Sequence, residues 1–84
     1  MTEFERTLLK VQELVAEVTG SELDDVTAYT SLVDELGITE IDMARLVAEL
    51  NAQCDIHLKP KNLDGEVETV YDLAMVVHEE MNLG

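Results

Sequence analysis

The sequence predicts an all-α fold, a small bundle of three substantial helices and one or two short ones. Apolar residues recur at helical spacing in three stretches, and a threonine followed three places later by an acid precedes each stretch. No stretch shows the apolar–polar alternation of a strand. Because 84 residues have room for a single modest core, we expect one domain over residues 1–84.

The first helix is predicted to begin after Thr2 and to run to about Thr19. Thr2 and Glu5 have the spacing of a capping box, in which each side chain accepts the other residue's backbone N–H. Gly20 follows as the expected C-terminal stop. The face predicted to enter the core comprises Phe4, Leu8, Val11, Leu14, Val15 and Val18.

Residues 21–37 form a long first loop without a helical period. A loop of this length in a small domain normally packs over the core or carries function. We expect packing, with a turn of helix over residues 21–26 and another near 31–35. Its acids lack the ligand spacing of a calcium loop, so no metal site is predicted. The apolar residues expected to pack are Leu23, Val26, Tyr29, Leu32, Val33 and Leu36.

The second helix is predicted to start after Gly37, with Thr39 and Asp42 as its capping box. Its apolar residues cover more than half of the helix circumference, which predicts a central helix packed on several neighbours. The polar face presents Asp42, Arg45 and Glu49, spaced so that Arg45 can pair with either acid. The apolar arc comprises Ile41, Met43, Ala44, Leu46, Val47, Ala48 and Leu50.

The connection over residues 51–65 contains the only proline, Pro60, between two lysines. Ile56 and Leu58 alternate with His57 and are expected to lie extended over the core, while residues 62–65 have room for no more than one helical turn. Thr69 and Asp72 form a third capping box at the last helix. The apolar side of that helix is Val70, Leu73, Ala74, Val77 and Met81.

Composition restricts the partners and the chemistry. The formal net charge of -14 repels nucleic acid and anionic membranes and favours a basic protein partner. His57, His78 and Cys54 are far apart in the sequence, so neither a catalytic site nor a zinc site is expected, and Cys54 is interpreted as a small core hydrophobe. A single cysteine and the absence of a signal-peptide pattern predict a cytoplasmic protein. The absence of a catalytic motif predicts that the protein is not an enzyme.

The order of these elements resembles an acyl carrier protein. The resemblance is carried by Val18-Thr19-Gly20, by residues 31–37 ending in Leu36-Gly37, by residues 46–50, and by Thr69 to Leu73. It implies a four-helix bundle with a long first loop and a short third helix. In that family an Asp-Ser-Leu begins helix two, and its serine takes a 4'-phosphopantetheine arm whose thiol carries acyl intermediates.

The sequence departs from the family at this functional point, where Thr39-Glu40-Ile41 stands in place of Asp-Ser-Leu. Thr39 keeps an oxygen for the helix cap, and Ile41 is expected to keep the apolar contact. Glu40 takes the serine position, and a carboxylate cannot act as the hydroxyl nucleophile that receives the arm. The acid still stabilises the helix start, by about 0.3 to 1 kcal/mol. No cofactor is therefore expected, although the family's cofactor is 4'-phosphopantetheine.

The favoured hypothesis is an acyl-carrier-protein-like domain of a fatty-acid or polyketide type pathway that acts as a monomer through protein–protein interaction. Its expected partners are acyl-chain or carrier-binding enzymes with basic patches. Asp42, Arg45 and Glu49 are the predicted docking residues, although this face is nearly neutral and the family's is usually acidic.

Two alternatives remain open. In the first, the chain is a working carrier, either because an unusual hydroxyl such as Thr39 or Ser31 is loaded or because the chain is an altered form of a serine-bearing parent. A hypothesis from another class is an acidic inhibitor or nucleic-acid mimic that binds a basic enzyme.

Overall fold

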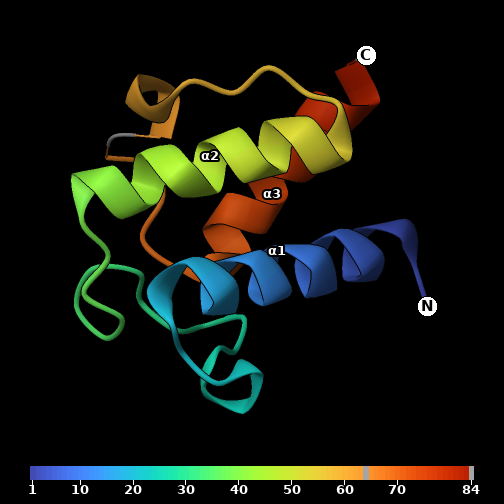
Figure 1. Ribbon diagram of the computed structural model, residues 1–84. Coiled ribbons are helices and arrows are strands. Elements are labelled where there is room, and N and C mark those ends of the chain that lie inside the picture. The colour runs from blue at the N-terminus through green and yellow to red at the C-terminus, as the bar shows by residue number, and fades with distance from the viewer. Residues whose placement is uncertain (64, 84) are drawn as a thin grey trace.

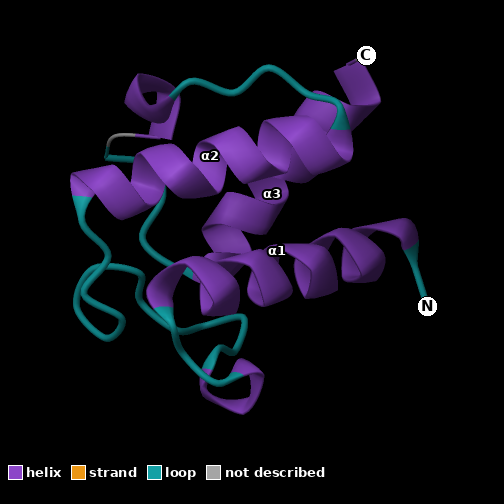
Figure 2. Ribbon diagram, in the orientation of Figure 1, coloured by secondary structure: helices purple, strands orange, loops and turns teal. Residues whose placement is uncertain are grey.

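A computed structural model describes residues 1–63 and 65–83, and it confirms the predicted all-α fold (Figures 1 and 2). Its helices are α1 (Glu3–Thr19), α2 (Glu40–Cys54) and α3 (Val70–Leu83), with two 3-10 turns, η1 (Leu23–Asp25) and η2 (Pro60–Leu63). Within the described ranges there is no strand, only an isolated antiparallel bridge between Ser31 and Thr69.

The four-helix count is not confirmed, because the described residues contain three α-helices. Where a short third helix was expected, the chain forms the four-residue 3-10 turn η2. Pro60 opens this turn without a backbone N–H, and Gly65 follows with a φ of 79°, so little chain is left in which an α-helix could propagate. Asp64, part of the turn predicted over residues 62–65, lies outside the described residues.

All three capping boxes form as predicted. At α1, the Thr2 N–H donates to Glu5 Oε1 at 3.0 Å and the Glu5 N–H donates to Thr2 Oγ1 at 3.1 Å. Gly20 ends the helix in the left-handed conformation, with a φ of 71°, which a glycine adopts without strain. These hydrogen bonds satisfy N–H groups that a helix start would otherwise leave without partners.

The core lies where the three helices meet. Figure 1 shows α1 and α2 running in opposite directions, with α3 crossing behind them. Ten of the predicted apolar helix residues are buried in the core, and Ile56 and Leu58 close it from the extended connection as expected. Phe4, Leu8 and Val18 pack against its edge. The ten buried helix residues are Val11, Leu14, Val15, Leu46, Val47, Leu50, Val70, Leu73, Ala74 and Val77.

The first loop packs over the core only in part. Val26 and Leu32 are buried as predicted, and the turn of helix expected over residues 21–26 is η1. The prediction is wrong for Leu23, Tyr29 and Val33, which are exposed, because an irregular chain turns alternate side chains away from the core. Residues 31–35 form hydrogen-bonded turns that do not propagate into a helix.

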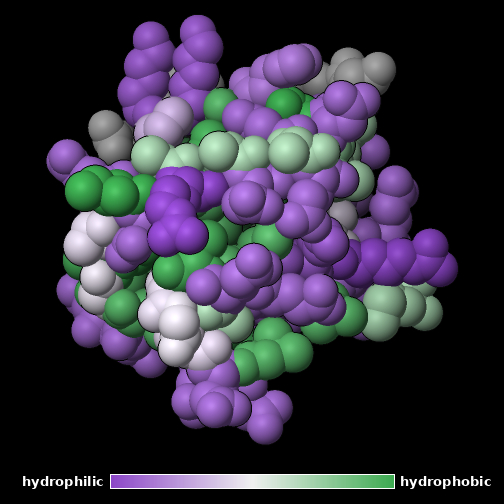
Figure 3. All heavy atoms as spheres, in the orientation of Figure 1, coloured by the Kyte–Doolittle hydropathy of each residue, from purple (hydrophilic) through white to green (hydrophobic). Residues whose placement is uncertain are grey.

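The prediction of a central α2 is also wrong. Leu46, Val47 and Leu50 are buried and Met43 is half-buried, whereas Ile41, Ala44 and Ala48 are exposed. The helix therefore lies on the outside of the bundle and packs through one side. Figure 3 shows the consequence, a row of apolar side chains along α2 at the surface.

On α3, Met81 is likewise more exposed than expected, at 38%. None of the helices described is at once long enough and apolar enough to cross a bilayer.

Candidate functional site

The chain is held firmly where it enters α2. Leu32 and Ile38 are both buried, and the Ile38 N–H donates to the Leu32 carbonyl at 2.9 Å. Gly37 stands between them with a φ of 63°, a conformation that disfavours any residue with a Cβ. Ile38 is thus the apolar anchor of this turn. The prediction that Ile41 keeps an apolar contact is wrong, since Ile41 is 75% exposed on the first turn of the helix.

The first turn of α2 is closed by reciprocal hydrogen bonds. The Asp42 N–H donates to Thr39 Oγ1 at 3.1 Å, and the Thr39 N–H donates to Asp42 Oδ2 at 3.2 Å. Glu40 is the first residue of the helix and is exposed. Its carboxylate therefore extends into solvent at the positive end of the helix dipole.

Two shallow cavities meet at Glu40. One, of about 170 Å³, is lined by Val33, Ile38, Thr39, Glu40 and Met43. The other, of about 250 Å³, is lined by Glu40, Met43, Pro60 and Lys61. Because both cavities share Glu40 and Met43, the start of α2 lies between one cavity on the side of the first loop and one on the side of η2.

Sequence reasoning did not place Val33, Pro60 or Lys61 at this site. Lys61 brings a cation to the cavity that Glu40 also lines. The available signal was the lone proline between two lysines, since a proline fixes the local backbone and so the position of its neighbours. The proline fixes the local backbone but does not by itself specify that this segment folds back toward α2.

The predicted docking residues lie along α2, with Arg45 and Glu49 exposed and Asp42 half-buried. Both acids have partners other than Arg45. The Asp42 carboxylate closes the helix cap, and Glu49 Oε2 accepts a hydrogen bond from Gln53 Nε2 at 3.1 Å. Both carboxylates are thus engaged within α2, while the Arg45 side chain is exposed to solvent.

The other candidate groups do not assemble into a reactive site. Ser31 Oγ accepts the Asp34 N–H at 3.1 Å, so this hydroxyl closes a turn. Burial raises the pKa of the Cys54 thiol, which packs against the core edge as the expected small hydrophobe. His57 is exposed, and His78 packs edge-to-face on Phe4. Over the described ranges, no three or more His, Cys, Asp or Glu side chains gather to hold a metal ion.

Comparison with known proteins places residues 9–77 in a family. This range matches the family model described as "Phosphopantetheine attachment site". The chain is 29% identical over 77 residues to the acyl carrier protein of an Exiguobacterium species, across 92% of this chain and 96% of that protein. It is 27% identical over 71 residues to the acyl carrier protein of Bdellovibrio bacteriovorus, across 84% of this chain and 90% of that protein. The acyl carrier protein of Thermotoga maritima is 24% identical over 81 residues, across 96% and 99% of the two chains.

Proposed function

The chain belongs to the phosphopantetheine attachment-site family of acyl carrier proteins, and we propose that it acts by protein–protein interaction without taking the family's prosthetic group. Members of this family are carrier proteins rather than enzymes, and their prosthetic group is 4'-phosphopantetheine. The pathway we propose is of the fatty-acid or polyketide type. We further propose a cytoplasmic monomer that binds proteins and not nucleic acid.

One observation supports the loss of attachment. Glu40 is the first residue of α2 and is exposed there, the place that the family resemblance gives to the attachment serine. Attachment forms a phosphodiester through a hydroxyl oxygen, and a carboxylate provides no such nucleophile. The residues at this position therefore do not fit the group, and we assign no step through it.

The neighbouring hydroxyls are poor replacements. Thr39 Oγ1 accepts the cap hydrogen bond from the Asp42 N–H and carries a β-methyl group, which restricts its rotation. Ser31 Oγ is likewise engaged, in the turn that precedes Gly37, and it is half-buried. Both hydroxyls are therefore already engaged in the hydrogen bonds that shape the backbone around Gly37.

Intact mass spectrometry tests this part of the proposal. The parent protein is incubated with coenzyme A and a broad-specificity phosphopantetheinyl transferase, beside a serine-bearing acyl carrier protein as a positive control. We expect the control to gain one phosphopantetheine group and the parent to keep its mass. A mass increase that Thr39→Ala or Ser31→Ala abolishes would instead identify an unusual attachment hydroxyl.

The proposed protein–protein interaction involves the outer face of α2. Asp42, Arg45 and Glu49 offer mixed charge beside exposed apolar side chains, a composition suited to docking. We propose that this face meets a basic patch on an acyl-chain or carrier-binding enzyme. The Glu40 carboxylate lies at the end of the same helix, where a loaded carrier presents the negative charge of its phosphodiester.

Calorimetric titration against a carrier-binding enzyme tests the docking face. We expect Glu49→Gln to weaken binding by about 1.4- to 5-fold, because a rim charge pair contributes about 0.2 to 1 kcal/mol. Glu40→Gln tests the charge at the helix start in the same way. Glu13→Gln is the matched control, since it removes the same charge from the exposed side of α1. Equal affinities for the Glu49 and Glu13 variants would contradict docking through α2.

A further inference from the structure

All three aromatic residues of the chain form one cluster, although they are far apart in the sequence. The Tyr29 and Tyr71 rings are stacked, with centroids 6.1 Å apart and planes inclined by 18°. Phe4 meets Tyr71 edge-to-face at 5.4 Å and His78 at 5.4 Å. Tyr29 is the outermost member and is 79% exposed. The cluster thus holds one face of the stack against the fold and leaves the other open to solvent.

Hydrogen bonds hold the turn that presents Tyr29. The Thr30 N–H donates to the Thr27 carbonyl at 3.2 Å, and the Thr27 N–H donates to Thr30 Oγ1 at 2.9 Å. Thr30 is buried, and the Tyr71 N–H donates to the Ala28 carbonyl at 2.7 Å. The exposed ring therefore stands on a preorganised turn, which lowers the conformational entropy that this turn would lose when a partner binds.

An acidic cavity adjoins this aromatic pair. The segments around Ser31 and Thr69 run antiparallel, joined by the bridge between them and by the Leu32 N–H donating to the Glu68 carbonyl at 2.9 Å. Burial alternates along the first segment, with Thr30 and Leu32 facing the core. Tyr29, Ser31 and Val33 consequently lie on the outer side of this segment. The outer face is continuous from the tyrosines to the cavity.

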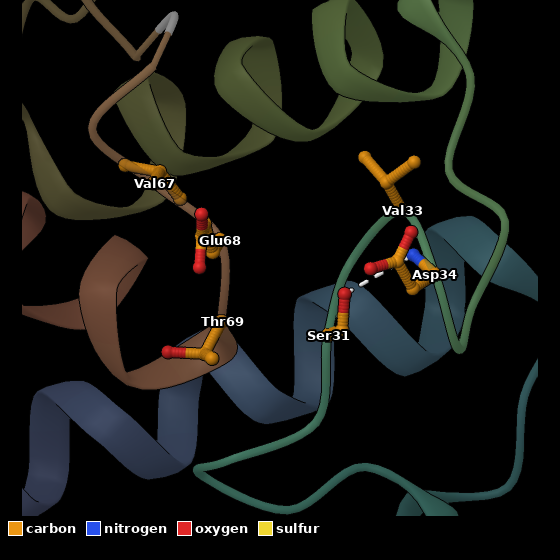
Figure 4. Close-up of a pocket in the computed structure, with 6 residues that line it drawn as sticks. All are labelled: Ser31, Val33, Asp34, Val67, Glu68 and Thr69. Atoms are coloured by element: carbon orange, nitrogen blue, oxygen red, sulfur yellow. Dashed lines mark hydrogen bonds between the residues drawn. The ribbon is translucent and has the colours of Figure 1, made fainter.

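The cavity, of about 350 Å³, is lined by Ser31, Val33, Asp34, Val67, Glu68 and Thr69. Figure 4 shows the Asp34 and Glu68 carboxylates on opposite walls, one from the first loop and one from the segment before α3. Both residues are exposed. Tyr29 precedes Ser31 by two residues and Tyr71 follows Thr69 by two, so the stacked pair borders the end of the cavity at which Ser31 and Thr69 are bridged. We call this surface, defined by Tyr29, Tyr71, Asp34 and Glu68, the strip.

We propose that this strip is a docking surface for an extended, arginine-bearing segment of a protein partner. A guanidinium stacks on an aromatic face and also donates paired hydrogen bonds to a carboxylate, so one side-chain type suits both halves of the strip. An extended segment projects alternate side chains from one side, so it can present one arginine to the tyrosine pair and another to the carboxylates.

The negative charge of this chain favours a cationic segment as the partner that binds the strip. The net charge of -14 opposes a second copy of this chain at the strip and favours a cationic segment. The surface involves neither Glu40 nor the docking residues of α2. It therefore goes beyond the proposed function and stands whether or not Glu40 prevents loading.

A synthetic peptide with arginine at every second position, (Gly-Arg)4, is the probe, and (Gly-Lys)4 is its charge-matched control. The chain has two tyrosines and no tryptophan, so its intrinsic fluorescence reports the stacked pair alone. We expect saturable quenching by the arginine peptide and at least 3-fold weaker binding of the lysine peptide, since lysine stacks poorly.

Variants then separate the strip from general charge attraction. With a fluorescently labelled peptide, we expect Tyr29→Ala and the pair Asp34→Asn/Glu68→Gln each to weaken binding at least 3-fold. The pair Glu13→Gln/Glu17→Gln removes the same charge from the exposed side of α1 and should change affinity less than 2-fold. Circular dichroism verifies that each variant is folded. Equal binding of the two peptides, or equal effects of the two double variants, would overturn the proposal.

Discussion

Helices α2 and α3 begin with the same capping device but differ in their first residue. Thr39 and Asp42 at α2 form the same reciprocal hydrogen bonds as Thr69 and Asp72 at α3, each near 3.1 Å. The first residue of α2 is the exposed Glu40, whereas the first residue of α3 is Val70, which is 0% exposed. Capping is thus a local property that depends on the threonine and on the acid three residues later.

Burial is decided by the elements that lie beside the helix. The start of α3 is enclosed by the first loop, since the Val70 N–H donates to the Thr30 carbonyl at 3.1 Å. The start of α2 projects beyond its buried anchor Ile38, and its side chains are free to meet another molecule. The start of α3 is therefore part of the core, whereas the start of α2 is exposed to solvent.

Exchanging the first residues of the two helices should give the largest effect. Val70→Glu places an unpaired carboxylate in the core and should lower the free energy of unfolding by at least about 4 kcal/mol. Glu40→Val should change it by less than about 1 kcal/mol, the loss of the helix-dipole interaction. Urea unfolding followed by circular dichroism measures both. Similar midpoints for the two variants would show that the helix starts are equally enclosed.

Removing the caps should affect both helices alike. Thr39→Ala and Thr69→Ala should each cost about 1 kcal/mol, because each leaves a first-turn N–H without its acceptor. Thr→Ser at the same positions keeps the hydroxyl and is the matched control. A much larger loss at Thr69 than at Thr39 would mean that the α3 cap is coupled to the core and is not purely local.

Acid should weaken the α3 cap in a defined direction. The N–H groups of Glu68 and Thr69 donate to the Asp72 carboxylate and hold its pKa below the ordinary value. A lowered pKa means that this stabilisation is complete above about pH 4 and is lost as the pH falls through the folded-state value. Asp72→Asn should therefore be less stable than the parent at pH 7, and thermal melts should show the difference shrinking below pH 4. A difference independent of pH would contradict the assignment.

The smallest effect is expected at Ile41. Because its side chain is 75% exposed, Ile41→Ser should change the free energy of unfolding by less than about 0.5 kcal/mol. Leu46→Ala, one turn further along the same helix and fully buried, should cost about 2 to 5 kcal/mol and provides the contrast in the same urea series. A loss above about 1 kcal/mol at Ile41 would restore it as an apolar anchor.

The sequence was sufficient for the features that short stretches determine. The three capping boxes, the Gly20 stop and the apolar faces of α1 and α3 all follow from spacings within one or two helical turns. The family resemblance was readable for the same reason, since it rests on the order of such stretches.

The features that could not be predicted from the sequence depend on contacts between distant segments. Ile41, Ala44 and Ala48 are as apolar as a buried face requires, but none of the described elements covers them. Lys61 and Glu40 line one cavity only because the segment at η2 folds back toward α2. The stacking of Tyr29 on Tyr71 likewise needs the first loop to lie against the start of α3.

We propose that this chain keeps the carrier scaffold and that one side chain, Glu40, prevents loading. The most direct test of this claim is the intact mass of Glu40→Ser beside the parent, after incubation of both with coenzyme A and a phosphopantetheinyl transferase. Because the family has an aspartate at the Thr39 position, the double variant Thr39→Asp/Glu40→Ser is measured in parallel. We predict that a serine-bearing variant gains one phosphopantetheine group and that the parent does not. A mass increase in the parent, or none in either variant, would contradict the claim.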